Sequence, residues 1–428
     1  MRRYESYKDS GVEWLGKIPS QWELTIGMNV FRENKRDNKG MKEKTVLSLS
    51  YGQIIIKPEE KLVGLVPESF ETYQIVEPND IIIRCTDLQN DQTSLRTGLA
   101  KDKGIITSAY LNLKVINNHS AKFLHYYLHT LDITKVLYKF GSGLRQNLSF
   151  LDFKRLPIID IPLSEQQKIA QFLDDKTAKI DQAVDLAEKQ IALLKEHKQI
   201  LIQNAVTRGL NPDVPLKDSG VEWIGQVPEY WEVKKITHIF PNIGSGTTPN
   251  SSDPSFYEGN INWLQTGDLT DGYIYKTSKT ITHKALQTYS TLKIYPKNSL
   301  VIAMYGATIG KVGLLQIETT TNQACCVLSA ALNIEMKYIF YLFQGIKESL
   351  VAMSYGGGQP NISQEKIRSL KLPFPNASEQ EQIADYLDKQ TAKIDQTIAL
   401  KTAHIEKLKE YKSVLINDVV TGKVRVSV

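Results

Sequence analysis

The sequence contains the stretch SEQQKIAQFLDDKTAKIDQ at residues 164–182, which recurs as SEQEQIADYLDKQTAKIDQ at residues 378–396. A second repeat, KDSGVEW, stands at residues 8–14 and again, letter for letter, at residues 217–223. Both copies of KDSGVEW continue through the same three residue types, namely Gly16, Pro19 and Trp22, then Gly225, Pro228 and Trp231. We call this the Gly-Pro-Trp motif. Solenoid repeats are about 20–50 residues long, whereas this unit fills half the chain, so the sequence indicates tandem duplication of a domain.

The repeated stretches begin two predicted long helices. Ser164 with Gln167, and Ser378 with Glu381, have the spacing of a capping box. Apolar residues then recur at alternating steps of three and four, which is typical of a coiled-coil seam: Leu173, Ile180, Val184, Ala187, Ile191, Leu194 and Leu201, then Leu387, Ile394, Ile398, Ile405, Leu408, Leu415 and Val419. Lys198 and Lys412 interrupt the two seams at matching places. We expect the helices to pack antiparallel on each other; the alternative is that each packs only on its own domain.

Between the shared parts the two halves differ strongly. Short β-rich runs such as residues 80–84 and 299–303 alternate with Gly, Asn, Pro and Ser loops, and helical patterns follow at residues 122–138 and 336–350. The predicted fold class is α+β, with two mixed α/β domains, two long antiparallel coiled-coil helices and internal pseudo-twofold symmetry. The predicted segments are the first Gly-Pro-Trp motif at 1–22, a variable domain at 23–150, a central helix at 151–210, the repeated motif and linker at 211–231, a second variable domain at 232–363, and a C-terminal helix at 364–428.

Composition limits the classes of function. The 428 residues include 41% hydrophobic side chains, and the formal net charge of +5 agrees with a polyanionic partner without establishing one. No apolar run approaches the length of a membrane span, and no apolar stretch follows Arg2 and Arg3 as in a signal peptide. The three cysteines and seven histidines do not fall at metal-ligand spacings. We therefore expect a cytoplasmic protein with no metal site.

Three segments look catalytic but depart from the motifs that they imitate. Gly306–Lys311 has three residues between its glycines where a phosphate loop has four, and Val312 follows the lysine in place of Ser or Thr. Asp253-Pro254-Ser255-Phe256 resembles the base-holding turn of amino-methyltransferases, but its third residue differs. Gly356–Gly358 could cradle an anion or act as a hinge. We expect no catalytic residue in this chain.

The tandem layout resembles the specificity subunits of type I restriction–modification enzymes over nearly the whole chain. The resemblance rests on the Gly-Pro-Trp motif, D-S-G-V-E-W-x-G-x-x-P-x-x-W, and on the helix start S-E-Q-x-x-I-A-x-(F/Y)-L-D. Residues 244–327 also look like a target-recognition domain of that family, through Gly246–Pro249, Trp263, Thr266–Leu269, Gly306–Lys311 and Asn322-Gln323. The first variable segment departs more from that pattern.

The resemblance implies a function for each part. In this family each variable domain reads one half of a bipartite, asymmetric DNA site, while the helices fix the spacing and dock two modification subunits. Those subunits carry S-adenosylmethionine and methylate adenine at N6, and restriction subunits add translocation and cleavage with ATP and magnesium. The implied partners are therefore double-stranded DNA, modification subunits and restriction subunits, and this chain holds no cofactor.

Candidate contact residues follow from side-chain chemistry, because basic residues bind phosphates while Arg, Gln and Asn read base edges. For phosphates we predict Lys35, Arg36, Lys57, Arg145 and Lys311. For bases we predict Arg84, Arg96 and Gln146 in the first half, and Thr247, Gln265, Tyr305, Thr308, Asn322 and Gln359 in the second. The helices agree off the seam at Lys179, Asp181 and Gln182 with Lys393, Asp395 and Gln396, which indicates a shared partner surface or a recent duplication.

Two other classes of function stay open at this point. A self-sufficient methyltransferase or nuclease would bind S-adenosylmethionine or modify DNA by itself. A structural adaptor would use its coiled coil to join two proteins without touching DNA.

Overall fold

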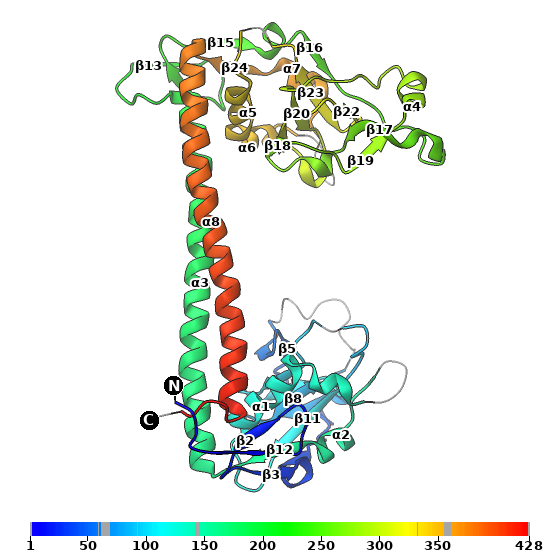
Figure 1. The fold of residues 1–428 in the computed structure, drawn as a ribbon, viewed down its shortest axis with the longest axis vertical. Helices are drawn as coiled ribbons and strands as arrows, with labels where there is room; N and C mark the ends of the chain where they lie inside the picture. The colour runs from blue at the N-terminus through cyan, green and yellow to red at the C-terminus, as the bar shows by residue number, and fades with distance from the viewer. Residues whose placement is uncertain are drawn as a thin grey trace. The chain divides into compact units, whose positions relative to one another are not determined.

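The computed structural model describes residues 2–58, 60, 69–91, 93–141, 146–331, 333–354 and 361–426. The chain divides into two compact units, one made of Met1–Ala187 with Ala403–Val428 and the other of Glu188–Thr402 (Figure 1). Each unit combines a mixed α/β domain with part of both long helices. Among the described residues, no helix is both long and apolar enough to cross a membrane.

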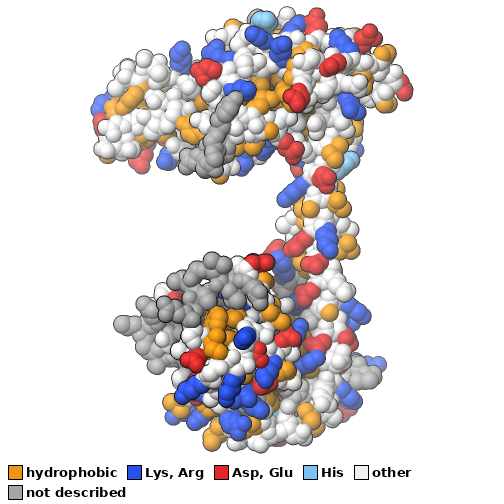
Figure 2. Space-filling view, turned by 180° about the vertical axis from the view of Figure 1, so that it is seen from behind, with side chains coloured by type: hydrophobic (Ala, Val, Ile, Leu, Met, Phe, Trp, Pro, Cys, Tyr) orange, Lys and Arg blue, Asp and Glu red, His pale blue; other side chains and the backbone are white. Residues whose placement is uncertain are grey.

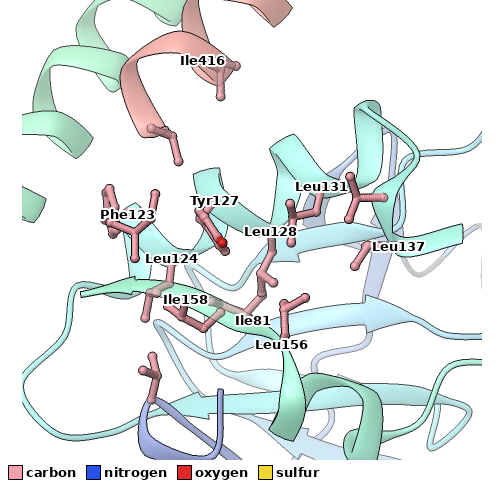
Figure 3. Packing of buried hydrophobic residues seen from close by; sticks show 14 of the residues in the cluster. Ile81, Phe123, Leu124, Tyr127, Leu128, Leu131, Leu137, Leu156, Ile158 and Ile416 are labelled. Carbon is pink, nitrogen blue, oxygen red and sulfur yellow. The ribbon is translucent and has the colours of Figure 1, made fainter. Parts of the chain in front are cut away.

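The first unit is built on a four-stranded antiparallel sheet. Its strand order is β4 (Phe31–Glu33), β11 (Tyr110–Val115), β8 (Ile81–Arg84) and β9 (Thr97–Leu99). Side chains alternate between the two faces of a strand, so Ile81 and Ile83 pack with helix α1 (Ala121–Ile133) while Ile82 packs in a separate cluster on the other face. Figure 3 shows Ile81 among the apolar residues of α1.

Smaller elements complete this unit. Four antiparallel strand pairs are present: β1 (Tyr7–Asp9) with β2 (Lys17–Pro19), β3 (Glu23–Ile26) with β12 (Pro157–Asp160), β5 (Leu47–Ser50) with β6 (Gln53–Ile56), and β7 (Gln74–Val76) with β10 (Gly104–Ile106). A short helix, α2 (Phe150–Arg155), precedes β12.

Among its described residues, the second unit has two sheets of three or more strands, beside two antiparallel strand pairs. The larger has the order β16 (Asn242–Gly244), β23 (Cys325–Ser329), β20 (Leu300–Ala303), β21 (Val312–Leu315) and β18 (Gly272–Ile274), with β18 and β21 parallel. The smaller consists of β19 (Lys279–Ile281), β17 (Tyr257–Leu264) and β22 (Thr320–Thr321). The other elements are β13 (Leu216–Asp218), β14 (Gln226–Pro228), β15 (Glu232–Lys235), α4 (His283–Thr288), α5 (Met336–Gly345), α6 (Lys347–Ala352), α7 (Gln364–Ser369) and β24 (Lys371–Phe374).

The long helices are α3 (Leu163–Arg208) and α8 (Ala377–Val420). They begin later than the predicted helical segments at 151 and 364, because α2 with β12, and α7 with β24, come first. Prolines account for these later starts, because a proline disfavours the helical conformation in the residue before it. Pro162 stands directly before α3, and Pro373 and Pro375 precede α8. The predicted capping boxes are also wrong, because each long helix begins one residue before the serine that was expected to cap it. Ser164 lies inside α3, and Asn376, whose side chain accepts a hydrogen bond from the Glu379 backbone, caps α8 in place of Ser378.

Within each unit α3 and α8 pack antiparallel, as the seams predict (Figure 1). In the first unit Lys412 Nζ lies 2.7 Å from Asp181 Oδ2, and Ile180 of α3 shares a core cluster with Leu415 and Ile416 of α8. In the second unit the equivalent pair, Lys198 with Asp395, is separated by 2.6 Å. Each lysine that interrupts a seam is thus paired with an aspartate of the opposite helix.

The Gly-Pro-Trp motif joins the start of one long helix to the end of the other. In the first unit buried Trp22 donates from Nε1 to Glu165 Oε1 of α3 at 3.2 Å. Gly422, just past α8, has φ +75°, and a Cβ there would lie 2.5 Å from Pro19 Cδ and 2.7 Å from Trp22 Cζ3.

The second unit repeats this joint with the helices exchanged. Trp231 Nε1 donates to Glu379 of α8 at 3.2 Å, and a Cβ on Gly209 at the end of α3 (φ +74°) would lie 3.3 Å from Trp231 Cζ2. The two halves therefore share tertiary contacts as well as amino-acid sequence.

Candidate nucleic-acid interface

In the second unit, the predicted base-contacting residues lie on loops that follow strand ends. Thr247 follows β16, Gln265 follows β17, Tyr305 follows β20 and Asn322 follows β22. Hydrogen bonds connect these loops: Trp263 Nε1 donates to the Thr247 carbonyl at 3.2 Å, the Asn322 N–H to the Leu264 carbonyl at 3.1 Å, and the Met304 N–H to the Ala324 carbonyl at 2.8 Å. The fold brings these candidates to one loop cluster.

The loop after β20 carries three of the candidates. Tyr305, Thr308 and Lys311 are all half-buried, and burial raises the pKa of the Tyr305 hydroxyl above its ordinary value. The Ala303 N–H donates to the Lys311 carbonyl at 2.8 Å, which closes the loop at its base. Tyr305 also forms a β-bridge with Asn361, next to the undescribed segment that contains Gln359.

Asn322 is less suited to DNA contact than predicted. It is only 9% exposed, and its side-chain oxygen accepts a hydrogen bond from the Ala324 N–H. Its neighbour Gln323 is exposed and accepts from the Thr248 hydroxyl at 2.7 Å. Sequence reasoning missed Thr248 and Gln323, although both stand within the motifs quoted above.

The first unit holds an equivalent loop between β8 and β9. The Arg84 N–H donates to the Arg96 carbonyl at 2.8 Å, matching Ala303 with Lys311. The Leu148 N–H donates to the Cys85 carbonyl at 2.8 Å, matching Ile362 with Met304. The described residues of the 85–95 loop in the first domain and residues 304–310 in the second thus occupy the same place in the two halves.

Arg96 does not read bases; it shapes this loop. Its side chain is fully buried, and all five of its guanidinium N–H donors can be used by the partners present. Nε bonds the Tyr138 hydroxyl, and Nη1 and Nη2 bond four main-chain carbonyls, those of Arg84, Thr86, Asp87 and Asp91. The prediction of a base contact is wrong because the loop folds round the guanidinium and closes it off from solvent.

Three other basic candidates of the first unit, Arg84, Lys35 and Arg36, are accessible but paired. Arg84 lies 3.1 Å from Asp91, whose pKa is held well below its usual range by hydrogen bonds from Ser94 and by the Arg84 charge. Lys35 pairs with Glu33 at 2.9 Å and Arg36 with Glu77 at 3.6 Å, both at exposed positions where phosphate could compete. Lys57 is half-buried and Gln146 exposed. Arg145, Gln359 and Gly356–Gly358 lie outside the described residues.

The candidate docking residues on the helices divide into two groups. All six are exposed, but Asp181 and Asp395 bind Lys412 and Lys198 of the opposite helix. Their agreement between the halves therefore has an intramolecular cause. The other four residues remain candidates for a partner surface: Lys179, Gln182, Lys393 and Gln396.

The structure adds aliphatic residues at equivalent places that the sequence analysis did not single out. They are Leu186 and Val414 in the first unit, and Leu400 and Ile200 in the second, all about half exposed or more.

On the face drawn in Figure 2, the Lys and Arg side chains of the described residues are interspersed with Asp and Glu side chains. No group of three or more His, Cys, Asp or Glu side chains that could hold a metal occurs among the described residues.

This architecture defines a class, the duplicated two-domain recognition subunit with paired long helices. The chain belongs to the type I restriction–modification DNA specificity family, whose model matches residues 29–195 and 228–410. It is accordingly a DNA-recognition subunit, a non-catalytic part of a restriction–modification system.

Individual relatives agree. The putative type I restriction enzyme MjaX specificity subunit of Methanocaldococcus jannaschii is 24% identical over 96% of both chains. The EcoR124I/EcoR124II specificity subunit of Escherichia coli is 27% identical over 64% of each. Among solved structures, one from work on assembly and conformational transition of the type I R-M system has a TM-score of 0.73 at 14% identity, covering 95% of this chain and 99% of the other. The HsdS subunit of Thermoanaerobacter tengcongensis has a TM-score of 0.55 at 15% identity, covering 95% and 98%.

Substitution of the two loop arginines separates their roles. Arg96→Ala should lower the free energy of unfolding by about 3 kcal/mol, because it leaves buried carbonyls without donors. Arg84→Ala should change it by about 1 kcal/mol or less, since its ion pair is partly exposed, yet weaken DNA binding. Urea unfolding and DNA titration of both variants check this. An Arg96→Ala protein as stable as the wild type would contradict the assigned role.

Proposed function

We propose that the two variable domains read different halves of one bipartite, asymmetric DNA site. The observation that carries this proposal is the equivalence of the loops at 85–95 and 304–310, which are closed by matching backbone hydrogen bonds but differ in length and side chains. Equivalent positions with different side chains suit two half-sites of different sequence. In this proposal α3 and α8 set the spacing between the half-sites, because the domains must reach grooves at a set distance.

We further propose that two modification subunits dock on the long helices, joined in some assemblies by restriction subunits. Internal pseudo-twofold symmetry gives one chain two equivalent surfaces for two identical partners. The exposed pairs Leu186 with Val414, and Leu400 with Ile200, support this, since each unit presents one aliphatic residue from each helix at matching positions. S-adenosylmethionine, ATP and magnesium would belong to the partners, and the expected cytoplasmic location is part of the same proposal.

DNA titration at several salt concentrations tests the proposal against its two rivals. A protein that neutralises 6–10 phosphates loses about 10³–10⁵-fold in affinity between about 50 and 200 mM salt, and we expect a steep fall of this kind. Absent or salt-insensitive binding would favour the structural adaptor. Binding of S-adenosylmethionine by the purified chain alone, or DNA modification without partners, would favour the enzyme.

Charge substitution tests the docking surfaces. Leu186→Asp should remove one modification subunit from the complex and Leu186→Asp with Leu400→Asp should remove both, because a carboxylate cannot be buried unpaired against an apolar partner. Native mass spectrometry counts the subunits. The control is Leu210→Asp, at an exposed leucine beyond the end of α3, which should leave assembly unchanged. Full assembly of the double variant would exclude these surfaces.

A further inference from the structure

The β5–β6 hairpin carries an unusual residue at its tip. Ser50 pairs with Gln53, so the turn consists of Tyr51 and Gly52, with φ +48° and +77°. Positive φ at both positions is the type I′ hairpin turn, which favours Asn, Asp or Gly at the first position. A tyrosine there is strained, and Tyr51 gains no packing in return because it is 94% exposed. Strain without packing points to a functional role.

The hairpin is held firmly against the domain. Leu47 and Ile54 face inward and join the cluster of Ile82 on the outer face of the four-stranded sheet. Opposite them stands Gly98 of β9, where a Cβ would lie 2.7 Å from Leu49 Cδ1 and 2.9 Å from Ile54 Cδ1. The hairpin therefore presents its outer face from a fixed position.

The tip lies beside the loop shaped by Arg96. A Cβ on Gly52 would lie 3.0 Å from Leu95 Cδ1, and Leu95 directly precedes Arg96 in that loop. The hairpin tip thus lies against Leu95, at the end of the loop that is the counterpart of the second domain's loop at 304–310.

The outer face of the hairpin has the chemistry of a DNA contact. Ser48, Ser50 and Gln53 alternate with the inward residues, and Ile55 is also exposed. The sequence from Lys44 to Lys57 contains no acidic residue, and within the described ranges neither lysine has a carboxylate partner. An uncharged ribbon between two lysines is suited to lie between phosphate backbones.

We propose that the β5–β6 ribbon enters the DNA major groove and that Tyr51 and Gln53 contact bases of the first half-site. The inference rests on the proposed function and names the reading element of the first domain. A two-stranded β-ribbon has the width that the major groove admits, the Gln53 amide can pair with adenine N6 and N7, and the Tyr51 ring offers an apolar surface to thymine methyl groups.

Half-site discrimination of the full complex tests this inference. Tyr51→Ala and Gln53→Ala are each assembled with the modification subunits, and affinity is measured for the wild-type site and for duplexes with the first or the second half scrambled. For the variants, the penalty for scrambling the first half should shrink by about 5- to 150-fold, the range of one good base contact. The penalty for the second half should stay as in the wild type. Tyr275→Ala is the matched control, since Tyr275 is 71% exposed but lies in the second unit; it should leave the first-half penalty unchanged.

Three other outcomes would overturn the inference. Variants that retain wild-type penalties at both halves would exclude the ribbon from base reading. Loss of a modification subunit with unchanged discrimination would show that the ribbon docks a protein. A wild-type complex indifferent to both halves would contradict the proposed function itself, and the inference with it. Because Tyr51 is almost wholly exposed, its removal is not expected to unfold the domain.

Discussion

The antiparallel pairing of α3 with α8 is the constraint on which the rest of the structure depends. A single amphipathic helix of this length exposes its apolar seam to water, so each helix needs a partner along its length. The two seam lysines make the pairing specific. Lys198 and Lys412 are about one third exposed or less, and each meets the repeated aspartate of the opposite helix. A parallel pairing or a shifted register would leave partly buried charges without partners, so these ion pairs favour one orientation and one register.

The same pairing determines where the domains attach. Each Gly-Pro-Trp motif bonds the first turn of one long helix through its tryptophan and packs on the glycine that ends the other. Each domain is thereby fastened to both helices at once. The joints and the helix register are repeated closely, whereas the loops at the strand ends differ between the halves. A repeated attachment to the helices combined with different loops suits a protein whose two domains are held in the same way but read different DNA sequences.

The duplication, the fold class and the antiparallel helices could be predicted because heptad spacing and repeated letters are local properties of a sequence. The strand-end loops of the second domain could also be predicted, since Thr247, Gln265 and Tyr305 stand in motifs with a family resemblance. Arg96 could not, because whether an arginine is buried depends on the carbonyls of residues 84–91 folding round it. The role of Asp181 and Asp395 was missed for a related reason: their lysine partners are far away in sequence and meet them only when the helices pair. Tyr51 carries no sequence signal, since its importance lies in a backbone conformation and an exposure that only the folded hairpin shows.

The central claim is that the helix pair converts its length into the distance between two DNA half-sites. The most direct measurement inserts one heptad after Lys189 in α3 and one after Ala403 in α8, which keeps the seams and both ion pairs, and then maps methylated sites by sequencing the genome of cells that express the complex. Seven residues add about 10 Å of helix, equal to about three base pairs of DNA. The account predicts two unchanged half-site sequences separated by a longer gap. An unchanged gap in an active complex would contradict it.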